Sequence, residues 1–423
     1  MTILDIYNIF LSSTGVSTDT RSIKTGNLFI ALSGDNFNGN KFAKQALEKG
    51  ASFAIIDDVN YKTKHTILVE NTLKTLQSLA NFHRKTLNLP IIALTGSNGK
   101  TTTKELINAV LSETYNTTAT IGNLNNHIGV PLTLLSMTKD TEIGIVEMGA
   151  NNFNEIELLA NIAEPDFGYI TNFGKAHLEG FGSLEGVVKA KSELYNYLRT
   201  HTKIAFVNSD NEKQLEQSKN IERVIFSENN NSNTQIKFTE ANPNVVVTYK
   251  NELIKSNLIG QYNFTNIAAA ITIGDYFKVS TSAIKKAIEN YYPTNNRSQI
   301  IQRNNNDIIL DAYNANPTSM KAALENLNQL KTTNKVVFLG DMFELGKTSN
   351  EEHQHIVDYI ENSTIETCYI LGEHFKNTKH SKNTKAYTDF KALKADFNNK
   401  YSNCTILIKG SRGMALERIL DLL

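Results

Sequence analysis

Residues 90–104 read PIIALTGSNGKTTTK, an apolar strand followed by a turn with two glycines, a lysine and three threonines. Gly96 and Gly99 let the backbone curl without Cβ clashes, and a helix that begins near Thr101 directs its free N–H groups at an anion. The common phosphate-loop pattern G-x-x-x-x-G-K-[ST] needs glycine at position 94, where this chain has Leu94. The stretch therefore predicts a phosphate-binding loop of a shorter type, TGSNGKT.

The lysine and the first threonine of this loop indicate what it binds. Lys100 is placed to reach the β- and γ-phosphates of a nucleotide, and the Thr101 hydroxyl is the expected ligand of the magnesium ion that bridges them. An ordinary strand-to-helix turn is the alternative. We predict a nucleotide site here, in an open α/β sheet that gathers its ligands at the carboxyl ends of its strands.

Two further polar residues follow apolar strand patterns and are expected at the same edge of the sheet. Glu147 ends the strand pattern EIGIVE, where a carboxylate can hold magnesium; a solvated strand-end glutamate is the alternative. His177 follows the next strand, in ITNFGKAH, and taken alone it is either a metal ligand or a hydrogen-bonded structural histidine. Both alternatives stay open at this point.

Lys191 lies in the helical segment EGVVKAKSELYNYL, where Val187, Leu194 and Leu198 place it within the apolar stripe while Lys189 points elsewhere. Burial lowers the pKa of a lysine, and the neutral amine can react with carbon dioxide to give a carbamate, in effect a carboxylate on a lysine stem. Such a group could hold a second magnesium ion. The alternative is a lysine whose stem packs while its head reaches water.

The strand and helix patterns divide the 423 residues into three α/β units. Residues 1–88 form a small unit, and residues 89–293 carry strand runs separated by helical patterns, which predicts a mainly parallel, helix-covered sheet. Residues 294–423 restart the pattern as a second doubly wound, Rossmann-like unit. Residues 227–260 alternate like strands, which predicts a small β excursion, with a solvated loop as the alternative.

Composition excludes several classes of partner. The 43 basic residues balance the 43 acidic ones, so no global field attracts nucleic acid or an anionic membrane. No apolar run reaches the roughly 18 residues that insert across a bilayer, and the N-terminus lacks a basic leader. Cys368 and Cys404 lie in apolar strand-like runs, which predicts buried reduced thiols. We expect a cytoplasmic protein that binds charged small molecules at local sites.

Together these patterns resemble the Mur ligase family, whose ATP loop has the form TGxxGK[ST]. The resemblance runs the whole length of the chain. It is strongest to the members that add D-alanyl-D-alanine to a UDP-N-acetylmuramoyl-tripeptide, through NLNNHIGVPLTLL, EMGA, FGKAHLEGFGSLEGVVKAKSELY, LDAYNANPTSM and FLGDMFELG. YNANP discriminates best, because the relatives that add the third peptide residue carry a DNPR-like element that this sequence lacks.

The resemblance implies an N-terminal UDP-substrate domain, a central ATP-binding domain and a C-terminal ligase domain, with ATP and two magnesium ions as cofactors. It implies catalytic roles for Lys100, Glu147, His177 and Lys191. The implied metal ligands are Thr101, Glu147, His177 and a carbamylated Lys191. The residues expected to bind ATP are Thr95, Gly96, Ser97, Asn98, Gly99, Lys100, Thr101, Thr102, Asn263, Asn266, Arg297 and Asp311. Departures from residues common in the family occur at Tyr262, Asn296 and Leu310.

The resemblance also implies a set of substrate contacts: Asp19, Arg21, Asn125, Asn126, Asn314 and Asn316. Asp19 and Arg21 match the D-x-R core of the family's uridine-binding element, although a structural ion pair is the alternative for Arg21. Asn314 and Asn316 belong to YNANP and are expected near the peptide substrates. The implied partners are two small molecules, UDP-N-acetylmuramoyl-tripeptide and D-alanyl-D-alanine, bound by a monomer.

The implied reaction is ATP-dependent amide formation through an acyl phosphate, which yields the UDP-N-acetylmuramoyl-pentapeptide precursor of peptidoglycan together with ADP and phosphate. One alternative is another amide ligase on the same scaffold, such as a folylpolyglutamate synthase or a different Mur ligase; the uridine-like element and YNANP argue against it. A second alternative is an ATP-controlled interaction protein. A pure switch has no need for a second metal site, so Glu147, His177 and Lys191 argue against that alternative.

Overall fold

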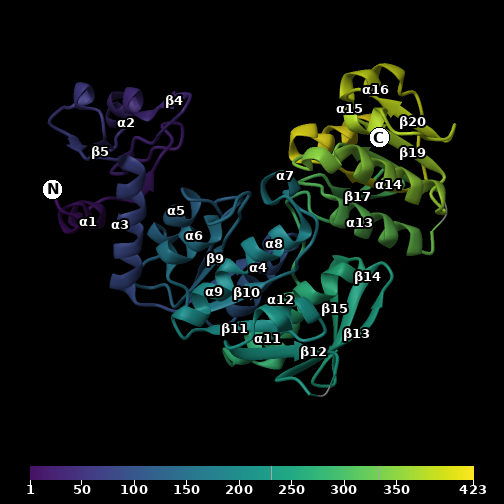
Figure 1. The fold of residues 1–423 in the computed structure, drawn as a ribbon, viewed down its shortest axis with the longest axis horizontal. Helices are drawn as coiled ribbons and strands as arrows, with labels where there is room; N and C mark the ends of the chain where they lie inside the picture. Colours follow the sequence, from purple (N-terminus) through teal and green to yellow (C-terminus); the bar gives the residue numbers. More distant parts are fainter. Residues whose placement is uncertain (230, 333) are drawn as a thin grey trace.

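The computed structural model describes residues 1–229, 231–332 and 334–423. It is an α/β protein of three domains, which confirms the predicted fold class. In Figure 1 the N-terminal domain (purple) and the C-terminal domain (green to yellow) flank a central domain (teal). Each domain is built around its own mainly parallel sheet.

The N-terminal domain contains a four-stranded parallel sheet in the order β1-β2-β5-β6 and a small antiparallel ladder, β3-β4. The strands are Val16–Ser17, Leu28–Ile30, Ser33–Gly34, Phe37–Asn38, Phe53–Ile56 and Thr66–Leu68, and the helices are α1 (Ile3–Leu11), α2 (Ala43–Glu48) and α3 (Thr72–Leu87). His83 of α3 contacts the Tyr7 hydroxyl at 3.1 Å through Nδ1 and the Met137 carbonyl oxygen at 2.9 Å through Nε2. Helix α3 thus ties this domain to the central one.

The central sheet has nine strands in the order β15-β14-β13-β12-β11-β10-β7-β9-β8. Strands β7 to β13 pair in parallel, as predicted, and β13 to β15 form the predicted β excursion in antiparallel register. Asn230, within the predicted excursion, lies outside the described residues. The strands are β7 Ile91–Thr95, β8 Thr117–Ala119, β9 Ile143–Glu147, β10 Phe167–Ile170, β11 Ile204–Asn208, β12 Glu222–Ser227, β13 Thr234–Ala241, β14 Asn244–Tyr249 and β15 Glu252–Ile259.

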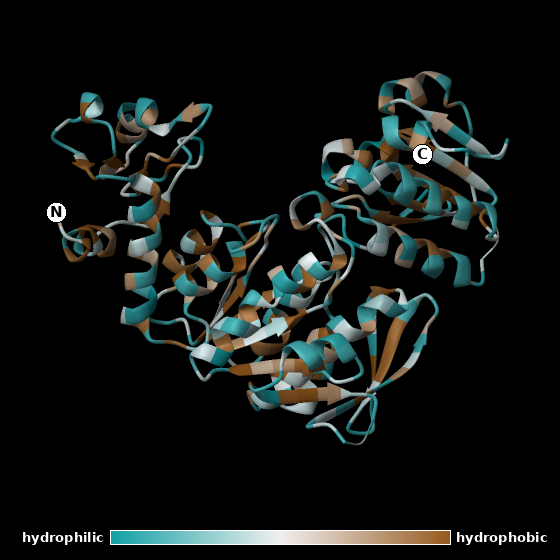
Figure 2. Cartoon of the chain, viewed as in Figure 1, coloured by the Kyte–Doolittle hydropathy of each residue, from teal (hydrophilic) through white to brown (hydrophobic). Residues whose placement is uncertain are grey.

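Helices cover both faces of this sheet, which explains why its inner strands are apolar without alternation. Along β7, Ile92 and Leu94 face one core, and Ile91 and Ala93 face the other. The first core is closed by α4 (Lys100–Leu111), α11 (Phe264–Tyr276) and α12 (Thr281–Glu289), and the second by α5 (Gly129–Leu135), α6 (Glu155–Ala163) and α9 (Glu193–Thr200). Figure 2 shows the strands as the most hydrophobic parts of the domain.

The segment that contains Lys191 differs from the single helix that its pattern suggests. It forms α8 (Leu184–Lys191) and α9, which meet at Ser192. The remaining short elements of this domain are α7 (Leu178–Phe181), α10 (Glu212–Gln217) and the 3-10 turn η3 (Gln261–Asn263). Lys191 therefore stands at the end of a helix, where its neighbours come from several elements.

The C-terminal domain carries a six-stranded sheet in the order β16-β17-β21-β18-β19-β20, parallel except for β16. Its elements are β16 Gln299–Arg303, β17 Asn306–Asp311, α13 Pro317–Gln329, β18 Lys335–Gly340, α14 Ser349–Glu361, β19 Thr367–Leu371, α15 Glu373–Lys376, β20 Thr384–Tyr387, α16 Phe390–Asp396 and β21 Thr405–Lys409. Cys368 and Cys404 are buried free thiols, as predicted. Within the described residues, no helix has the length and apolar character needed to cross a membrane.

Candidate active site

A cavity of about 630 Å³ opens between the central and C-terminal domains at the carboxyl ends of their parallel strands. The phosphate loop and the ends of β9 and β10 form one wall, and the segment after β17 forms the other. Most of the residues predicted for ATP, metal and peptide binding line this cavity: Ser97, Asn98, Gly99, Lys100, Thr101, Thr102, Asn125, Asn126, Glu147, His177, Asn263, Asn266, Arg297, Asp311, Asn314 and Asn316.

The strand, turn and helix predicted around the phosphate loop are present. Strand β7 ends at Thr95, and α4 begins at Lys100 directly after Gly99, whose φ of 79° is a left-handed conformation that favours glycine. A Cβ on Gly96 would lie 2.0 Å from the Thr171 hydroxyl oxygen. The two glycines are therefore required by space and by backbone conformation, and the helix N-terminus faces the cavity.

Several hydrogen-bond donors in the cavity suit an anionic ligand. Lys100 donates to the carbonyl oxygens of Gly96 and Ser97 at 2.7 and 3.2 Å, and burial lowers its pKa. Asn98 Nδ2 and Arg297 Nε are buried donors with no hydrogen-bond partner in the part of the chain that the structure describes. Because unpaired buried donors are costly, phosphate oxygens are the natural acceptors for them.

Glu147 is buried, 1% exposed, and only one of its oxygens is satisfied within the described residues. Oε1 accepts from the Thr101 hydroxyl at 3.2 Å and from Asn125 Nδ2 at 2.8 Å, while Oε2 has no hydrogen-bond partner in residues 1–229, 231–332 and 334–423. A free carboxylate oxygen beside a threonine hydroxyl is a donor set that suits magnesium. The residues present therefore fit the ion predicted at this position.

Lys191 is completely buried, which excludes the alternative in which its head reaches water. Its Nζ donates to the Ala150 carbonyl oxygen at 3.1 Å and lies 5.1 Å from the centre of the Phe181 ring. Burial, and after it the positive charge of Lys100, lowers the pKa of Lys191 to about 7. At neutral pH a large fraction of this side chain is therefore an uncharged amine, the form that reacts with carbon dioxide.

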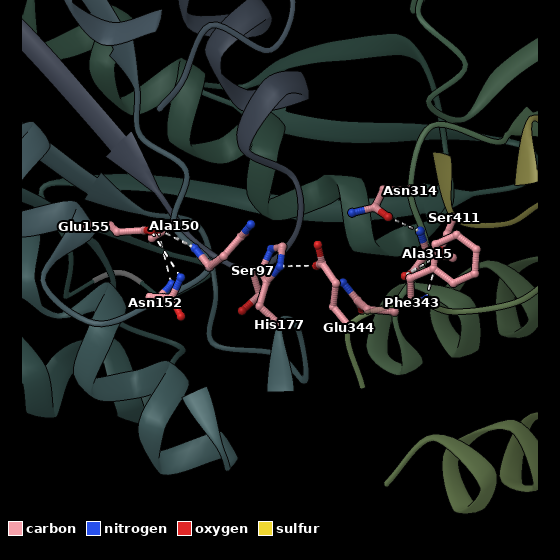
Figure 3. Close-up of polar contacts among 12 residues, drawn as sticks. Ser97, Ala150, Asn152, Glu155, His177, Asn314, Ala315, Phe343, Glu344 and Ser411 are labelled. Atoms are coloured by element: carbon pink, nitrogen blue, oxygen red, sulfur yellow. Dashed lines mark hydrogen bonds and ion pairs between the residues drawn. The ribbon is translucent and has the colours of Figure 1, made fainter. Parts of the chain in front are cut away.

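His177 lies at the end of the loop after β10 and has a left-handed backbone, φ 52°. Its Nδ1 contacts the carboxylate of Glu344 from the C-terminal domain, as Figure 3 shows, and this hydrogen bond lowers the pKa of Glu344. Among the residues described, no three His, Cys, Asp or Glu side chains form a ready metal cluster. His177 and Lys191 both lie against the Phe181 ring, the imidazole centre at 6.2 Å and Lys191 Nζ at 5.1 Å from the ring centre.

Residues from the central and C-terminal domains meet in the cavity. Asn266 Nδ2 donates to Asn263 Oδ1 at 2.7 Å, and the Arg297 guanidinium stacks on the Tyr313 ring at 3.6 Å from its centre. Asn316 Nδ2 donates to Asn98 Oδ1 at 2.7 Å, so YNANP touches the phosphate loop directly. The positions predicted for nucleotide and peptide binding thus share one space.

Five predicted residues lie outside the lining of this cavity: Thr95, Gly96, Lys191, Asp19 and Arg21. Thr95 and Gly96 support the phosphate loop from behind, Thr95 by donating to the Met148 carbonyl oxygen at 2.7 Å. Asp19 and Arg21 belong to the N-terminal domain and pair with each other at 2.6 Å, with the Arg21 side chain 88% exposed. The ion pair considered as the alternative for Arg21 is therefore formed, and a uridine contact stays a prediction.

Sequence patterns alone miss several polar residues at or beside this cavity, four of which bear on the site. Glu155, Tyr313 and Lys409 line it, and Glu344 reaches it through His177. Lys409 is buried and its Nζ contacts Asp311 at 2.5 Å, so it holds a residue that was predicted to approach ATP. Strand β21 reads as an ordinary apolar run, and only its parallel pairing beside β17 reveals the role of its last residue.

Known proteins resemble this chain along its whole length. Three family models match in order: "Mur ligase family, catalytic domain" over residues 12–84, "Mur ligase middle domain" over 94–274 and "Mur ligase, glutamate ligase domain" over 296–412. The UDP-N-acetylmuramoyl-tripeptide–D-alanyl-D-alanine ligase of Bacillus subtilis (strain 168) is 35% identical over 424 residues, which cover 96% of this chain and 92% of the relative.

Solved structures give the same result. MurF from Acinetobacter baumannii superposes with a TM-score of 0.85 at 28% identity and covers 100% of this chain and 98% of its own. MurF ligase from Thermotoga maritima in complex with ADP superposes with a TM-score of 0.85 at 25% identity, covering 98% of this chain and 97% of its own. The chain therefore belongs to the Mur ligase family.

Proposed function

We propose that the protein joins D-alanyl-D-alanine to UDP-N-acetylmuramoyl-tripeptide at the expense of ATP, forming the pentapeptide precursor of peptidoglycan. The observation that carries the proposal is the shared cavity. It holds the phosphate loop, the unpaired carboxylate oxygen of Glu147 and the asparagines of YNANP between two domains. The full-length similarity to the Bacillus subtilis ligase supports this choice over other amide ligases.

The chemistry explains why ATP is needed. A carboxylate is a poor electrophile, so an oxygen of the tripeptide's terminal carboxylate first attacks the γ-phosphorus of ATP, and ADP leaves. The acyl phosphate formed in this step is then attacked by the amine of the dipeptide; phosphate leaves, and the amine loses a proton as the amide forms. Lys100 would stabilise charge on the transferring phosphoryl group.

We propose that Thr101 and Glu147 hold one magnesium ion and that His177 and a carbamylated Lys191 hold a second. When bound, the ions supply charge neutralisation and orientation for the phosphoryl group. The free Oε2 of Glu147 supports the first site, and the burial of Lys191, with its pKa of about 7, supports the carbamate at the second. Arg297 and Asp311 would approach the nucleotide from the C-terminal domain.

The domains have separate tasks in this proposal. Residues 1–88 bind the UDP end of the precursor through Asp19 and Arg21, residues 89–293 bind ATP, and residues 294–423 close on the peptide and the dipeptide. Holding acyl phosphate and amine together removes an entropic barrier of roughly 7 to 11 kcal/mol, and closure of the C-terminal domain over the cavity would shield the acyl phosphate from water. The protein acts as a monomer in the cytoplasm, where ATP and UDP-linked precursors occur.

Release of ADP tests the function. With magnesium-ATP and UDP-N-acetylmuramoyl-tripeptide, ADP release should depend on added D-alanyl-D-alanine, and omission of either substrate should reduce it to background. Parallel assays with diaminopimelate- and lysine-containing tripeptides identify the third residue that the enzyme accepts. ADP release that is unaffected by both peptide substrates would contradict the proposal and favour a nucleotide-controlled interaction protein.

A further inference from the structure

We name residues 171–179 the coupling segment. The segment begins directly after β10 and ends with the first two residues of α7. On one side the segment is bonded to the phosphate loop. The Ser97 hydroxyl donates to the Gly174 carbonyl oxygen and accepts from the Gly174 N–H, both at 2.9 Å, and Asn98 N–H donates to Asn172 Oδ1 at 3.1 Å. A movement of the segment would therefore displace the loop that is proposed to hold the ATP phosphates.

On its other side the coupling segment is bonded to the C-terminal domain, and in Figure 1 α7 lies next to that domain. Lys175 N–H donates to the Thr318 hydroxyl at 2.9 Å, and Lys175 Nζ pairs with Glu352 at 2.6 Å. Glu179 N–H donates to the Glu344 carbonyl oxygen at 3.0 Å. The coupling segment therefore links the phosphate loop to the C-terminal domain.

His177 and Glu344 also meet at this interface, and both have a left-handed backbone. Their φ angles are 52° and 62°, a left-handed conformation that non-glycine residues keep only when surrounding contacts enforce it. On the Glu344 side, Phe343 N–H donates to the Ser411 hydroxyl at 2.9 Å, as drawn in Figure 3. The Glu344 carboxylate is therefore presented to the imidazole by a fixed loop.

We propose that Glu344 is a positioning residue that orients His177 from the neighbouring domain. An ionised carboxylate only accepts hydrogen bonds, so Nδ1 of His177 must carry a proton, and in the neutral imidazole the lone pair then lies on Nε2. A carboxylate behind a histidine fixes ring and tautomer in this way at metal sites. The consequence is that docking of the C-terminal domain completes the His177 side of the active site.

The proposal that Glu344 orients His177 does not depend on the reaction that the protein catalyses. The proposal that the oriented His177 binds a metal ion rests on the proposed function. Two readouts separate these points. The first is the tautomer of His177 in ¹⁵N-histidine-labelled protein without metal, with the resonance assigned by its loss in His177→Gln. The second is the magnesium concentration that gives half-maximal ADP release.

For the tautomer, Glu344→Ala should lose the preference for Nδ1–H that the wild-type protein shows, whereas Glu344→Gln should retain it because the amide oxygen still accepts. The Glu344 side chain is 46% exposed, so its removal takes little buried area from the fold. Glu352→Gln is the matched control: it weakens the ion pair with Lys175 at the same interface but leaves His177 untouched. An unchanged His177 tautomer in Glu344→Ala would overturn the proposal.

For magnesium, Glu344→Ala should raise the half-maximal concentration by about tenfold or more, the usual effect of removing a carboxylate behind a metal-ligating histidine. Glu352→Gln should change it less than about twofold, a small effect for a pair that is only one of several interface contacts. Equal shifts in both variants would show that Glu344 acts only in docking, which contradicts the positioning role. A wild-type protein without ligase activity would refute the proposed function and leave the tautomer result to stand alone.

Discussion

Replacing Lys100 by methionine should lower the rate of ADP release roughly 10²–10³-fold, or about 3 to 4 kcal/mol of transition-state stabilisation. Methionine has a similar length but carries no positive charge, so it cannot stabilise the negative charge on the transferring phosphoryl group. In the structure Lys100 Nζ is held over the phosphate loop by the carbonyl oxygens of Gly96 and Ser97. Steady-state kinetics with saturating substrates measures the effect.

Two controls separate this role from a structural one. Circular dichroism of Lys100→Met should match that of the wild-type protein and its melting temperature should change little, because the hydrogen bonds of Lys100 Nζ go to carbonyl oxygens of its own loop. Lys100→Arg keeps the charge, yet the larger planar guanidinium does not fit a site built for a compact ammonium, so we expect a similar loss. ADP release at the wild-type rate in Lys100→Met would refute the assigned role.

Lys191→Ala should lose most ligase activity while nucleotide binding survives, and short carboxylic acids such as acetate or propionate should restore part of it. The acid would occupy the space left by the side chain and return a carboxylate to the position of the carbamate. Lys189→Ala is the matched control, because Lys189 belongs to the same helix but is exposed. Activity should be unchanged in that variant.

The pH dependence of carbamylation follows from the pKa of Lys191, about 7. The neutral amine attacks carbon dioxide and releases a proton, so the carbamate should accumulate as the pH rises through 7 and be lost as it falls. ¹³C-bicarbonate should give a carbamate resonance in the wild-type protein that is absent from Lys191→Ala. Full activity of Lys191→Ala without added acid would remove the carbamate from the account.

Much of the fold follows from local patterns in the sequence. The phosphate loop was predictable because a strand, two glycines and a helix start lie within fifteen residues, and each is a local preference. The apolar residues at helical spacing around Lys191 predicted that its stem packs in the core, but the spacing alone did not decide whether its head reaches water. The break between α8 and α9 at Ser192 was not predictable, because a buried kink keeps the same apolar spacing on both sides.

The contacts between domains could not be read from the sequence. His177 and Glu344 are separated by 167 residues, and their contact depends on how two independently folded domains dock. Lys409 became significant only when β21 was found beside β17, a pairing that neither strand pattern specifies. Asp19 and Arg21 show that a motif match does not by itself reveal a contact. They match the family's uridine-binding element, but in the structure their side chains form an ion pair with each other.

The transfer of a carboxylate oxygen to phosphate tests the central claim most directly. The substrate is UDP-N-acetylmuramoyl-tripeptide with ¹⁸O in both oxygens of its terminal carboxylate. It reacts with ATP and D-alanyl-D-alanine, and mass spectrometry measures the masses of the released phosphate and of the nucleotide product. If the acyl phosphate forms, the released phosphate carries one ¹⁸O, and the other remains in a nucleotide product that is heavier by one dipeptide unit. Unlabelled phosphate, or no heavier nucleotide, would contradict the account.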